Sequence, residues 1–557
     1  MDDLLGLPDY ETARNSFELA VPETCNFGFD VIDRRAREAD KVALIYDDAN
    51  TGETRAVKFS ELAGASNRFA NLLAGLGVAK GDFAFMMVPR VPAWYEAAIG
   101  CIKAGVVAMP GTNLLMPKDI EYRINKAGAK LAIVAGDTAE RVLAVRDKCP
   151  TLAHVIVIGA GLEGCVHYET AMSEASDEYP RDQAPETRAD DMMFAYFTSG
   201  TTAFPKMVPR EHSYALAHTI TAKYWQDLKE SDVHWTISDT GWAKFAWGMM
   251  FGQWQIGATL LLNNPAAGFD ADAHLKLIAK HRVTTFCAPP TVFRAFVQLD
   301  LPAYDLSTIR HSISAGEPLN PEVIRVWKQA TGTIVHDGYG QTETINVVAN
   351  VPGLEVRPGS MGKPVPGLTV DIVDDDANIL GDGEVGHIAI KLTDPWPPGL
   401  FHGYYEDDEG SGKCFRNGWY FTGDTATRDE DGYIWFVGRA DDLIGSSGYR
   451  ISPFEVESVL VEHAAVAEAA VIGKKDEARG EIVKAYVTLA EGFEPGEALV
   501  KELQDFVKSQ TAPYKYPREI EFRAELPKTI SGKIRRVELR AEANAAEANA
   551  AEANAND

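Results

Sequence analysis

The sequence predicts a large α/β protein with mainly parallel crossover sheets, followed by a smaller α+β unit. Over residues 1–440, short apolar runs typical of buried strands alternate with segments of helical periodicity. Strands that alternate with helices form crossover units, and crossover units build parallel sheets. Residues 441–540 instead mix a few helices and strands, as expected for a compact α+β domain.

Individual elements of the large domain follow from local patterns. Helix-like spacing of three and four residues links Leu62, Ala65, Phe69, Leu72 and Leu76 on one face. Buried strands are predicted at Leu131–Ala135, Val155–Ile158, Thr259–Leu262, Val283–Ala288 and Ile334–Val335. Helices are predicted between them at Thr138–Lys148, Ala271–Lys280 and Pro321–Ala330.

The pattern changes towards the C-terminal end. Residues 359–436 alternate short strands with Gly, Pro and Asp turns, which indicates a β-barrel-like subdomain. Beyond Asp441 we expect a helix at Pro453–Glu462 and strands at Val466–Ile472 and Ile482–Leu489. Residues 541–557 repeat Ala, Glu and Asn without a large apolar residue, so they form a low-complexity tail. The predicted domains are therefore 1–440, 441–540 and 541–557.

Composition limits the classes of function. A net charge of −27 argues against bulk nucleic-acid binding and against docking on anionic membranes. No uncharged apolar run approaches the ~18 residues of a membrane helix, and the acidic start lacks the pattern of a signal peptide. Six scattered cysteines without a CxxC pair suggest neither disulfides nor a zinc site. From these features we expect a cytoplasmic protein without membrane insertion.

A loop rich in hydroxyl residues and glycine, Thr198–Lys206, follows the apolar run Met192–Tyr196. Main-chain N–H groups and Ser or Thr hydroxyls can donate hydrogen bonds to phosphate oxygens, while Lys206 supplies positive charge. The loop is not a Walker A motif, because GxxxxGK[ST] is absent and the lysine follows a proline. On this stretch alone, a phosphate loop and an ordinary surface loop both remain open.

A second motif, Asp337–Thr344, also follows a predicted strand. Its two glycines allow the main chain to approach a ligand closely. Tyr339 offers a flat face to a nucleobase, and Thr342 offers a hydroxyl to a phosphate. Glu343 offers a hard oxygen ligand to Mg²⁺. The alternative interpretation is a turn with a hydrogen-bonded tyrosine and a solvated glutamate.

Three further motifs combine glycine, hydroxyl residues and charge. In Tyr420–Asp424, a Thr-Gly turn presents an aspartate that can accept hydrogen bonds from both ribose hydroxyls; a plain hairpin turn is the alternative. The other two are Ser446–Arg450 and Pro527–Lys533. Lys533 lies in a Thr/Ser/Gly loop before a basic segment, where a solvated lysine is the alternative.

In this order and at this spacing, the five motifs resemble those of the adenylate-forming superfamily, which contains acyl-CoA synthetases, nonribosomal peptide adenylation domains and luciferases. The resemblance covers residues 25–540 and is closest to the AMP-forming medium-chain acyl-CoA synthetases. Further stretches similar to that family are Val88–Trp94, Gly100–Gly105, Trp235–Trp242 and Thr511–Arg518.

The resemblance implies a role for each motif residue. The implied catalytic residues are Lys533, Lys206, Thr342 and Glu343, with Glu343 as metal ligand and Asp441 as hinge. The implied ATP-binding residues are Thr198, Ser199, Gly200, Thr201, Thr202, Lys206, Gly316, Glu317, Pro318, Asp337, Gly338, Tyr339, Gly340, Gln341, Thr342, Asp424, Arg439, Arg450 and Lys533. The implied CoA-binding residues are Ser447, Gly448, Tyr449, Arg479, Lys508, Tyr516, Pro517 and Arg518.

The implied reaction uses ATP, Mg²⁺ and coenzyme A to convert a carboxylic acid into acyl-CoA, a step of fatty acid metabolism. A carboxylate is a poor acyl donor, so it first attacks the α-phosphorus of ATP to give acyl-AMP, and the CoA thiol then displaces AMP. The C-terminal domain is expected to be mobile and to rotate about Asp441, bringing Lys533 to the first step and Gly448 to the second. A carrier-protein-loading adenylation enzyme and an idle nucleotide-binding sensor are the alternatives, and a homodimer stays open.

The acyl pocket is implied at Trp242, Phe245 and Trp247, with ordinary core packing as the alternative. A bulky indole beside the acyl group limits chain length, so we expect short- to medium-chain acids, including branched or cyclic ones. Lys244 is unusual among these aromatic residues and either extends outward or pairs with an acid. Ala203 replaces a glycine common in the family, and Ala243–Trp247 departs from the animal medium-chain enzymes, which leaves the acyl specificity open.

Overall fold

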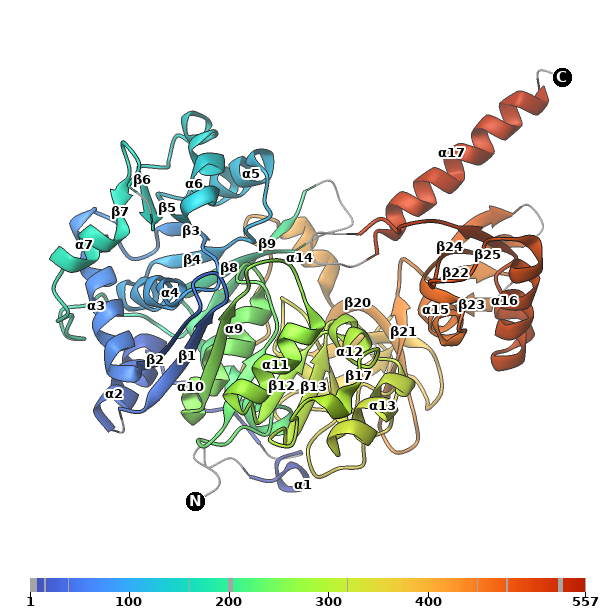
Figure 1. Ribbon diagram of the computed structural model, residues 1–557, viewed down its shortest axis with the longest axis horizontal. Coiled ribbons are helices and arrows are strands. Elements are labelled where there is room, and N and C mark those ends of the chain that lie inside the picture. Colours follow the sequence, from blue (N-terminus) through green and yellow to red (C-terminus); the bar gives the residue numbers. More distant parts are fainter. Residues whose placement is uncertain are drawn as a thin grey trace. The chain divides into compact units, whose positions relative to one another are not determined.

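The computed structural model describes residues 8–14, 17–38, 40–159, 161–198, 204–317, 319–447, 449–476, 479–528 and 534–555 (Figure 1). The chain divides into two compact units. Unit 1 contains residues 1–370 and 391–418, and unit 2 contains residues 371–390 and 419–557. The large parallel-sheet part and the smaller C-terminal part confirm the predicted α/β class.

A seven-stranded sheet forms one half of unit 1, in the order β7-β6-β5-β3-β4-β8-β9. All neighbouring strands for which a register is defined are parallel except β8 and β9, which form an antiparallel pair at the edge. The strands are β3 (Phe83–Met87), β4 (Val107–Pro110), β5 (Leu131–Ala135), β6 (His154–Ile158), β7 (Val166–His167), β8 (Met192–Thr198) and β9 (Lys206–Glu211).

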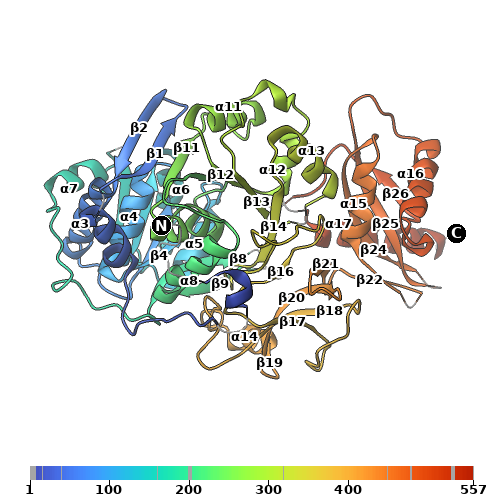
Figure 2. The ribbon, with the colours of Figure 1, turned by 90° about the horizontal axis from the view of Figure 1, so that it is seen from below.

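A nine-stranded sheet forms the other half, in the order β16-β15-β14-β13-β12-β10-β11-β1-β2 (Figure 2). Its central strands run parallel, and its edges are antiparallel. The strands are β1 (Val42–Asp48), β2 (Glu53–Lys58), β10 (Val233–Thr236), β11 (Thr259–Asn264), β12 (Thr285–Ala288), β13 (His311–Ala315), β14 (Val335–Gly340), β15 (Asn346–Ala349) and β16 (Lys363–Pro364).

Helices connect these strands. The longer ones are α3 (Phe59–Gly75), α4 (Pro92–Ala104), α5 (Pro117–Ala127), α8 (His212–Tyr224), α11 (Ala271–His281) and α13 (Pro321–Thr331). The shorter ones are α1 (Tyr10–Ala13), η1 (Gly28–Asp33), α2 (Arg34–Glu38), α6 (Gly136–Leu143), η2 (Arg146–Lys148), α7 (Tyr168–Glu174), α9 (Ala243–Met249), α10 (Phe251–Ile256), α12 (Pro290–Phe296), η3 (Leu301–Ala303) and α14 (Asp408–Cys414), which precedes strand β19 (Phe415–Arg416).

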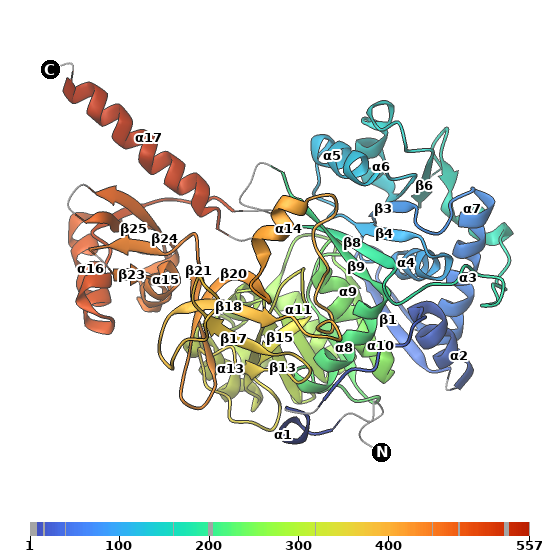
Figure 3. The ribbon, with the colours of Figure 1, turned by 180° about the vertical axis from the view of Figure 1, so that it is seen from behind.

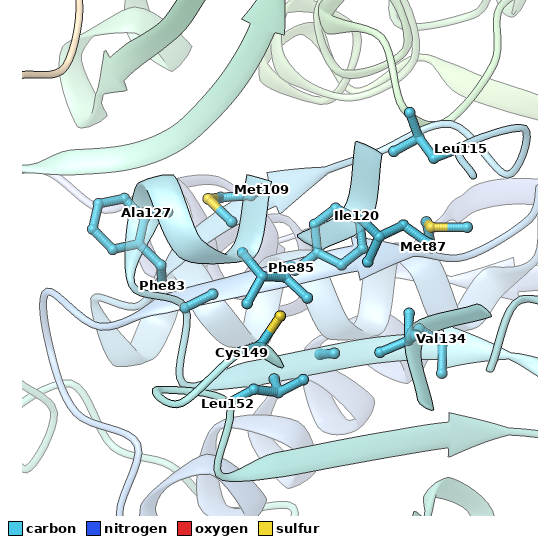
Figure 4. Packing of buried hydrophobic residues seen from close by; sticks show 14 of the residues in the cluster. Phe83, Phe85, Met87, Met109, Leu115, Ile120, Ala127, Val134, Cys149 and Leu152 are labelled. Atoms are coloured by element: carbon cyan, nitrogen blue, oxygen red, sulfur yellow. The ribbon is translucent and has the colours of Figure 1, made fainter. Parts of the chain in front are cut away.

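The core of the seven-stranded sheet shows why its strands are continuous apolar runs. Phe83, Phe85 and Met87 point to one face of β3 and pack against Ile120 of α5 and Val134 of β5 (Figure 4). The alternate residues of β3 are buried as well. A parallel strand covered on both faces requires apolar side chains at every position, and this is what makes such strands recognisable in the sequence.

Helix ends follow local capping rules. Helix α13 begins with Pro321 after Asn320, whose side chain accepts a hydrogen bond from the main-chain N–H of Glu322 at 2.7 Å. It ends at Gly332, whose φ of 74° lies in the left-handed region that glycine favours. These signals are why the predicted helix Pro321–Ala330 agrees with the observed one within one residue.

Unit 2 contains β17 (Val370–Val373), β18 (Gly386–Lys391), β20 (Trp419–Arg428) and β21 (Ile434–Arg439), followed by a C-terminal α+β part (Figure 3). That part has a five-stranded sheet covered by helices. Its elements are β22 (Ile444–Ser446), β23 (Tyr449–Ile451), α15 (Pro453–Glu462), β24 (Val466–Asp476), β25 (Gly480–Leu489), α16 (Glu497–Gln510), η4 (Pro513–Lys515), β26 (Glu519–Phe522) and α17 (Arg536–Ala555).

The C-terminal repeats lie within helix α17. Unit 2 combines the C-terminal residues with residues 371–390 and 419–440. These two segments contain most of strands β17 and β18 and all of β20 and β21. The division into functional domains at residue 440 stays a prediction.

Candidate functional site

Strands β8 and β9 hold the two ends of the predicted phosphate loop together. They are antiparallel, and their register pairs Thr198 directly with Lys206. Ser199, Gly200, Thr201, Thr202 and Ala203 lie outside the described residues.

Lys206 is held by aromatic and acidic neighbours at the start of β9. Its Nζ lies 4.2 Å from the centre of the Tyr404 ring and 3.9 Å from Oδ2 of Asp407. The cation is therefore placed over a π face and near a carboxylate, with part of its side chain still accessible to solvent.

Tyr404 connects Lys206 to the second motif. Its hydroxyl donates a hydrogen bond to Oε1 of Glu343 at 2.9 Å. Burial and the nearby Glu343 carboxylate raise the pKa of Tyr404, so its hydroxyl stays protonated and remains a donor. Glu343 is itself buried, which leaves this carboxylate oriented by the protein rather than by water.

The turn that carries Thr342 and Glu343 is closed by its own hydrogen bonds. The main-chain N–H of Gln341 donates to Oγ1 of Thr344 at 2.9 Å, and Thr344 donates to the carbonyl oxygen of Ile345 at 2.7 Å. Short side-chain bonds of this kind fix a tight turn between two antiparallel strands, here β14 and β15.

The glycines of the second motif are packed closely against other parts of the protein. A Cβ on Gly338 would lie 2.6 Å from Cε2 of Trp225, and a Cβ on Gly340 would lie 2.4 Å from the carbonyl oxygen of Ile345. The protein itself occupies the space beside each glycine. Close packing of the strand therefore excludes a side chain at these two positions, and the expected approach of a ligand stays a prediction.

Asp337, within the buried part of β14, is a buried acid. Its Oδ1 accepts a hydrogen bond from the N–H of Gly338 at 2.9 Å. Burial raises the pKa of Asp337 to about 8, although hydrogen bonds and the positive charge of Lys244 act to lower it. Lys244 donates from Nζ to the carbonyl oxygen of Ala315 at 2.9 Å. Lys244 thus bonds a main-chain carbonyl oxygen, and its charge acts on Asp337.

Three of the remaining predicted adenine residues follow β13, and the fourth, Tyr339, lies on β14. Gly316 has a φ of 111°, a conformation that side-chain-bearing residues rarely adopt. Glu317 pairs with Arg294 at 3.4 Å, while Pro318 lies outside the described residues. Tyr339 is half-buried at the end of β14.

In unit 2, the predicted ribose residues lie opposite one another. Asp424 on β20 pairs in register with Arg439 on β21, and Oδ1 of Asp424 lies 3.6 Å from Nη1 of Arg439. Asp424 is buried, whereas the predicted hinge residue Asp441 is exposed and accepts a hydrogen bond from Nε of Arg439 at 3.4 Å. The structure thus brings these three predicted residues together.

The predicted CoA residues form two groups. In the first, Arg479 donates from Nη1 to Oγ of Ser447 at 3.2 Å, and Tyr449 stacks on Tyr514 with ring centres 4.1 Å apart.

In the second group, Lys508 lies 4.2 Å from the centre of the Tyr516 ring, and Arg518 donates to the Tyr516 hydroxyl at 2.8 Å. Pro517 lies between these two partners in sequence. Gly448 and Lys533 lie outside the described residues, as does the side chain of Arg450.

The predicted acyl-pocket residues do not share one face of α9. Phe245 is buried against Trp94, with ring centres 4.7 Å apart. Trp247 instead lies 5.6 Å from Trp225 and is half-buried, as is Trp242 at the N-terminal end of the helix. Residues two apart on a helix point in nearly opposite directions, so Phe245 belongs to the core while Trp247 faces the other side.

Three residues of this region were absent from the sequence-based set: Arg210, Tyr404 and Asp407. Tyr404 and Asp407 approach Lys206 from a loop about 200 residues further along the chain. Arg210 lies four residues after Lys206 on strand β9. Because side chains alternate along a strand, this spacing was the one sequence signal that Arg210 shares a face with Lys206.

The fold and these motifs define a nucleotide-binding enzyme of the AMP-binding class. The model of the AMP-binding enzyme family matches residues 32–405, and that of the AMP-binding enzyme C-terminal domain matches residues 455–533. The chain belongs to the AMP-binding enzyme family, which confirms the resemblance to the adenylate-forming superfamily.

Within that family the similar proteins are acyl-CoA synthetases and CoA ligases. The mitochondrial acyl-coenzyme A synthetase ACSM3 of Rattus norvegicus is 41% identical over 543 residues, covering 96% of this chain and 93% of that protein. The mitochondrial ACSM4 of Homo sapiens is 42% identical over 546 residues, with the same coverage of 96% and 93%. These relatives confirm the medium-chain branch of the family.

The similar solved structures are also CoA ligases and acyl-CoA synthetases. The anthranilate CoA ligase AuaEII, in complex with anthranoyl-AMP, superposes with a TM-score of 0.87 at 32% identity, covering 95% of this chain and 99% of that one. An acyl-CoA synthetase of Brucella canis has a TM-score of 0.73 at 36% identity, with coverage of 97% and 100%.

The prediction of a cytoplasmic protein is wrong by these comparisons, because the similar curated synthetases are mitochondrial. Free cysteines indicate a reducing compartment but do not distinguish one reducing compartment from another. Among the described residues, no helix is both long and apolar enough to cross a membrane, and no three His, Cys, Asp and Glu side chains form a metal-binding group.

Proposed function

We propose that this chain is an AMP-forming acyl-CoA synthetase, which joins a short- or medium-chain carboxylic acid to coenzyme A while ATP is cleaved to AMP and pyrophosphate. The observation that carries the proposal is the connected group Lys206–Tyr404–Glu343, which lies at the loop and turn to which we assign ATP. A cation over the ring of a tyrosine and a carboxylate oriented by the hydroxyl of the same tyrosine suit a bound triphosphate.

In the first step, a carboxylate oxygen attacks the α-phosphorus, and the bond from that phosphorus to the bridging oxygen breaks. Pyrophosphate leaves with the electron pair, and acyl-AMP forms. No protein nucleophile is required, so the protein contributes positioning and compensation of charge. Lys206 is assigned to the β- and γ-phosphates, Thr342 to the α-phosphate, and Lys533 to the substrate carboxylate and ATP.

Mg²⁺ fits the donor set beside the turn. This ion usually takes only one or two protein carboxylates and completes its shell with phosphate oxygens and water. Glu343 supplies one buried carboxylate held by Tyr404, which matches that requirement. When bound, the ion neutralises charge on the phosphates.

In the second step, the CoA sulfur attacks the acyl carbonyl carbon, the carbon–oxygen bond to AMP breaks, and the thiol proton passes to solvent. The domain beginning at Asp441 is assigned a rotation between the two steps, which replaces Lys533 by Gly448 at the reacting centre. The cluster of Lys508, Tyr516 and Arg518 supports free CoA as the acceptor, because two cations around one aromatic ring suit its phosphates and adenine.

The rest of the nucleotide is assigned by the same motifs. Gly316, Glu317 and Pro318 line the adenine, Tyr339 stacks on it, and Asp424 with Arg439 binds the ribose. Trp242 and Trp247 remain the proposed acyl-pocket residues.

The test is a product assay with ATP, Mg²⁺, CoA and a series of linear, branched and cyclic acids from C2 to C12. We expect AMP, pyrophosphate and acyl-CoA in equal amounts, with the highest kcat/KM for short or medium acids. Formation of ADP would contradict the proposal. AMP without acyl-CoA would point to a carrier-protein thiol, and no nucleotide turnover would point to a sensor.

A further inference from the structure

Arg210 is a fully buried cation beside the turn that carries Thr342 and Glu343. Its side chain has no accessible surface, and no carboxylate of the described residues lies within ion-pairing distance of its guanidinium. Burying an arginine away from any carboxylate is costly unless other groups compensate for its charge. The groups that contact the guanidinium therefore indicate the role of Arg210.

Main-chain carbonyl oxygens provide that compensation. Nη1 of Arg210 donates to the carbonyl oxygens of Glu343 at 2.8 Å and of Thr342 at 3.4 Å. Nη2 donates to the carbonyl oxygen of Gly399 at 2.5 Å. The guanidinium also lies over the ring of Tyr214, with its central carbon 3.8 Å from the ring centre.

These contacts fix the main chain of one residue, Glu343. The carbonyl of Thr342 belongs to the peptide before Glu343, and the carbonyl of Glu343 belongs to the peptide after it. Because peptides are planar, holding both carbonyls determines φ and ψ at Glu343. The N–H of Phe401 adds a further bond to the Glu343 carbonyl at 2.9 Å, and Tyr404 holds the carboxylate itself.

The same strand places Lys206. Side chains alternate along a strand, so Lys206 and Arg210, four residues apart on β9, point to the same face. One strand therefore sets both the cation assigned to the phosphates and the guanidinium that holds the Glu343 turn.

We propose that Arg210 is a positioning residue, which acts through Glu343 by fixing the two peptides on either side of it and so placing its carboxylate for Mg-ATP. The inference rests on the proposed function, and it assigns Arg210 no contact with substrate.

The test compares two variants. Arg210→Met keeps the approximate side-chain volume but removes every hydrogen-bond donor, whereas Arg210→Lys keeps the positive charge but loses the planar guanidinium group that donates to several carbonyl oxygens at once. ATP binding to the full chain is measured by titration calorimetry with and without Mg²⁺. We expect the methionine variant to lose on the order of tenfold in the Mg²⁺-dependent part of ATP affinity. We expect its Mg²⁺-free affinity to stay near that of the wild type, and the lysine variant to lie between the two.

Activity gives a second readout. A misplacement of about 1 Å at a catalytic group costs on the order of 10²-fold, so acyl-AMP formation in Arg210→Met should fall by that order. Conversion of supplied acyl-AMP to acyl-CoA should stay near the wild-type rate. In the double variant Arg210→Met with Glu343→Gln, the loss of acyl-AMP formation should equal that of Glu343→Gln alone. Both substitutions remove the same interaction, that of the Glu343 carboxylate with Mg-ATP.

Arg35→Met is the matched control. Arg35 is also buried and donates to a main-chain carbonyl oxygen, that of Gln255, but it contacts neither Thr342 nor Glu343. We expect it to lower thermal stability without changing the Mg²⁺ dependence of ATP binding.

The inference would be overturned if ATP binding to both Arg210 variants depended on Mg²⁺ as in the wild type. It would also be overturned if the losses of acyl-AMP formation in the two single variants multiplied in the double variant. If the methionine variant does not fold, the lysine variant decides alone. Failure of the wild type to form acyl-AMP would instead reject the proposed function, so the two failures are distinguishable.

Discussion

Replacing Asp337 by Asn should change how the stability of unit 1 depends on pH. Burial raises the pKa of Asp337 from 3.8 to about 8. Between these values the unfolded chain has lost the proton and the folded chain keeps it, so the folded protein becomes less stable as pH rises. The contribution is roughly 1.4 kcal/mol per pH unit, or about 4 kcal/mol between pH 5 and pH 8.

Asparagine keeps the Oδ1 atom that accepts the hydrogen bond from Gly338, but it cannot ionise. Urea unfolding followed by tryptophan fluorescence suits the comparison, since eight of the ten tryptophans lie in unit 1. The stability of Asp337→Asn relative to the wild type should rise steadily from pH 5 to pH 8. A constant difference over that interval would refute the buried-acid argument.

Asp48→Asn provides the control. Burial acts to raise the pKa of Asp48, but hydrogen bonds from Asn50 and Tyr46 outweigh it and lower the pKa below its ordinary value. The stability from this acid is present above pH 4 and is lost only in stronger acid, so the effect of Asp48→Asn should not vary between pH 5 and pH 8.

Three further predictions concern the proposed reaction. Lys533→Ala should slow acyl-AMP formation by on the order of 10²–10³, while thioester formation from supplied acyl-AMP persists; equal losses in both half-reactions would contradict the two-conformation scheme. Asp441→Pro fixes φ at the proposed hinge, so pyrophosphate exchange should persist while CoA-dependent turnover falls, and unchanged turnover would place the hinge elsewhere. Trp242→Gly should extend the accepted chain, gaining roughly 0.8 kcal/mol per added methylene; an unchanged kcat/KM profile from C2 to C12 acids would exclude Trp242 as the pocket limit.

Elements with strong local signals were predictable. The strand Leu131–Ala135 and the helix Pro453–Glu462 match the observed β5 and α15 at both ends. A strand buried on both faces must be apolar throughout, and a helix with Ser452 as its cap and Pro453 at its first position has a defined start. Such features depend only on neighbouring residues.

Contacts between distant segments were not predictable in the same way. The hydroxyl of Tyr404 reaches Glu343 across 61 residues, and the guanidinium of Arg210 reaches the Glu343 carbonyl across 133. No local pattern marks such pairs, because they form only when separate strands and loops come together. The exclusion of a side chain at Gly338 could not be predicted either, because Trp225, which causes it, is a tertiary neighbour.

The central claim is that a substrate carboxylate attacks the α-phosphorus of ATP, and oxygen labelling tests it most directly. With both oxygens of the acid labelled with ¹⁸O, the attacking oxygen remains on phosphorus when CoA displaces AMP. Mass spectrometry should therefore find one labelled oxygen in AMP for each acyl-CoA formed, and none in pyrophosphate. Unlabelled AMP, or label in inorganic phosphate alongside ADP, would contradict the adenylation mechanism.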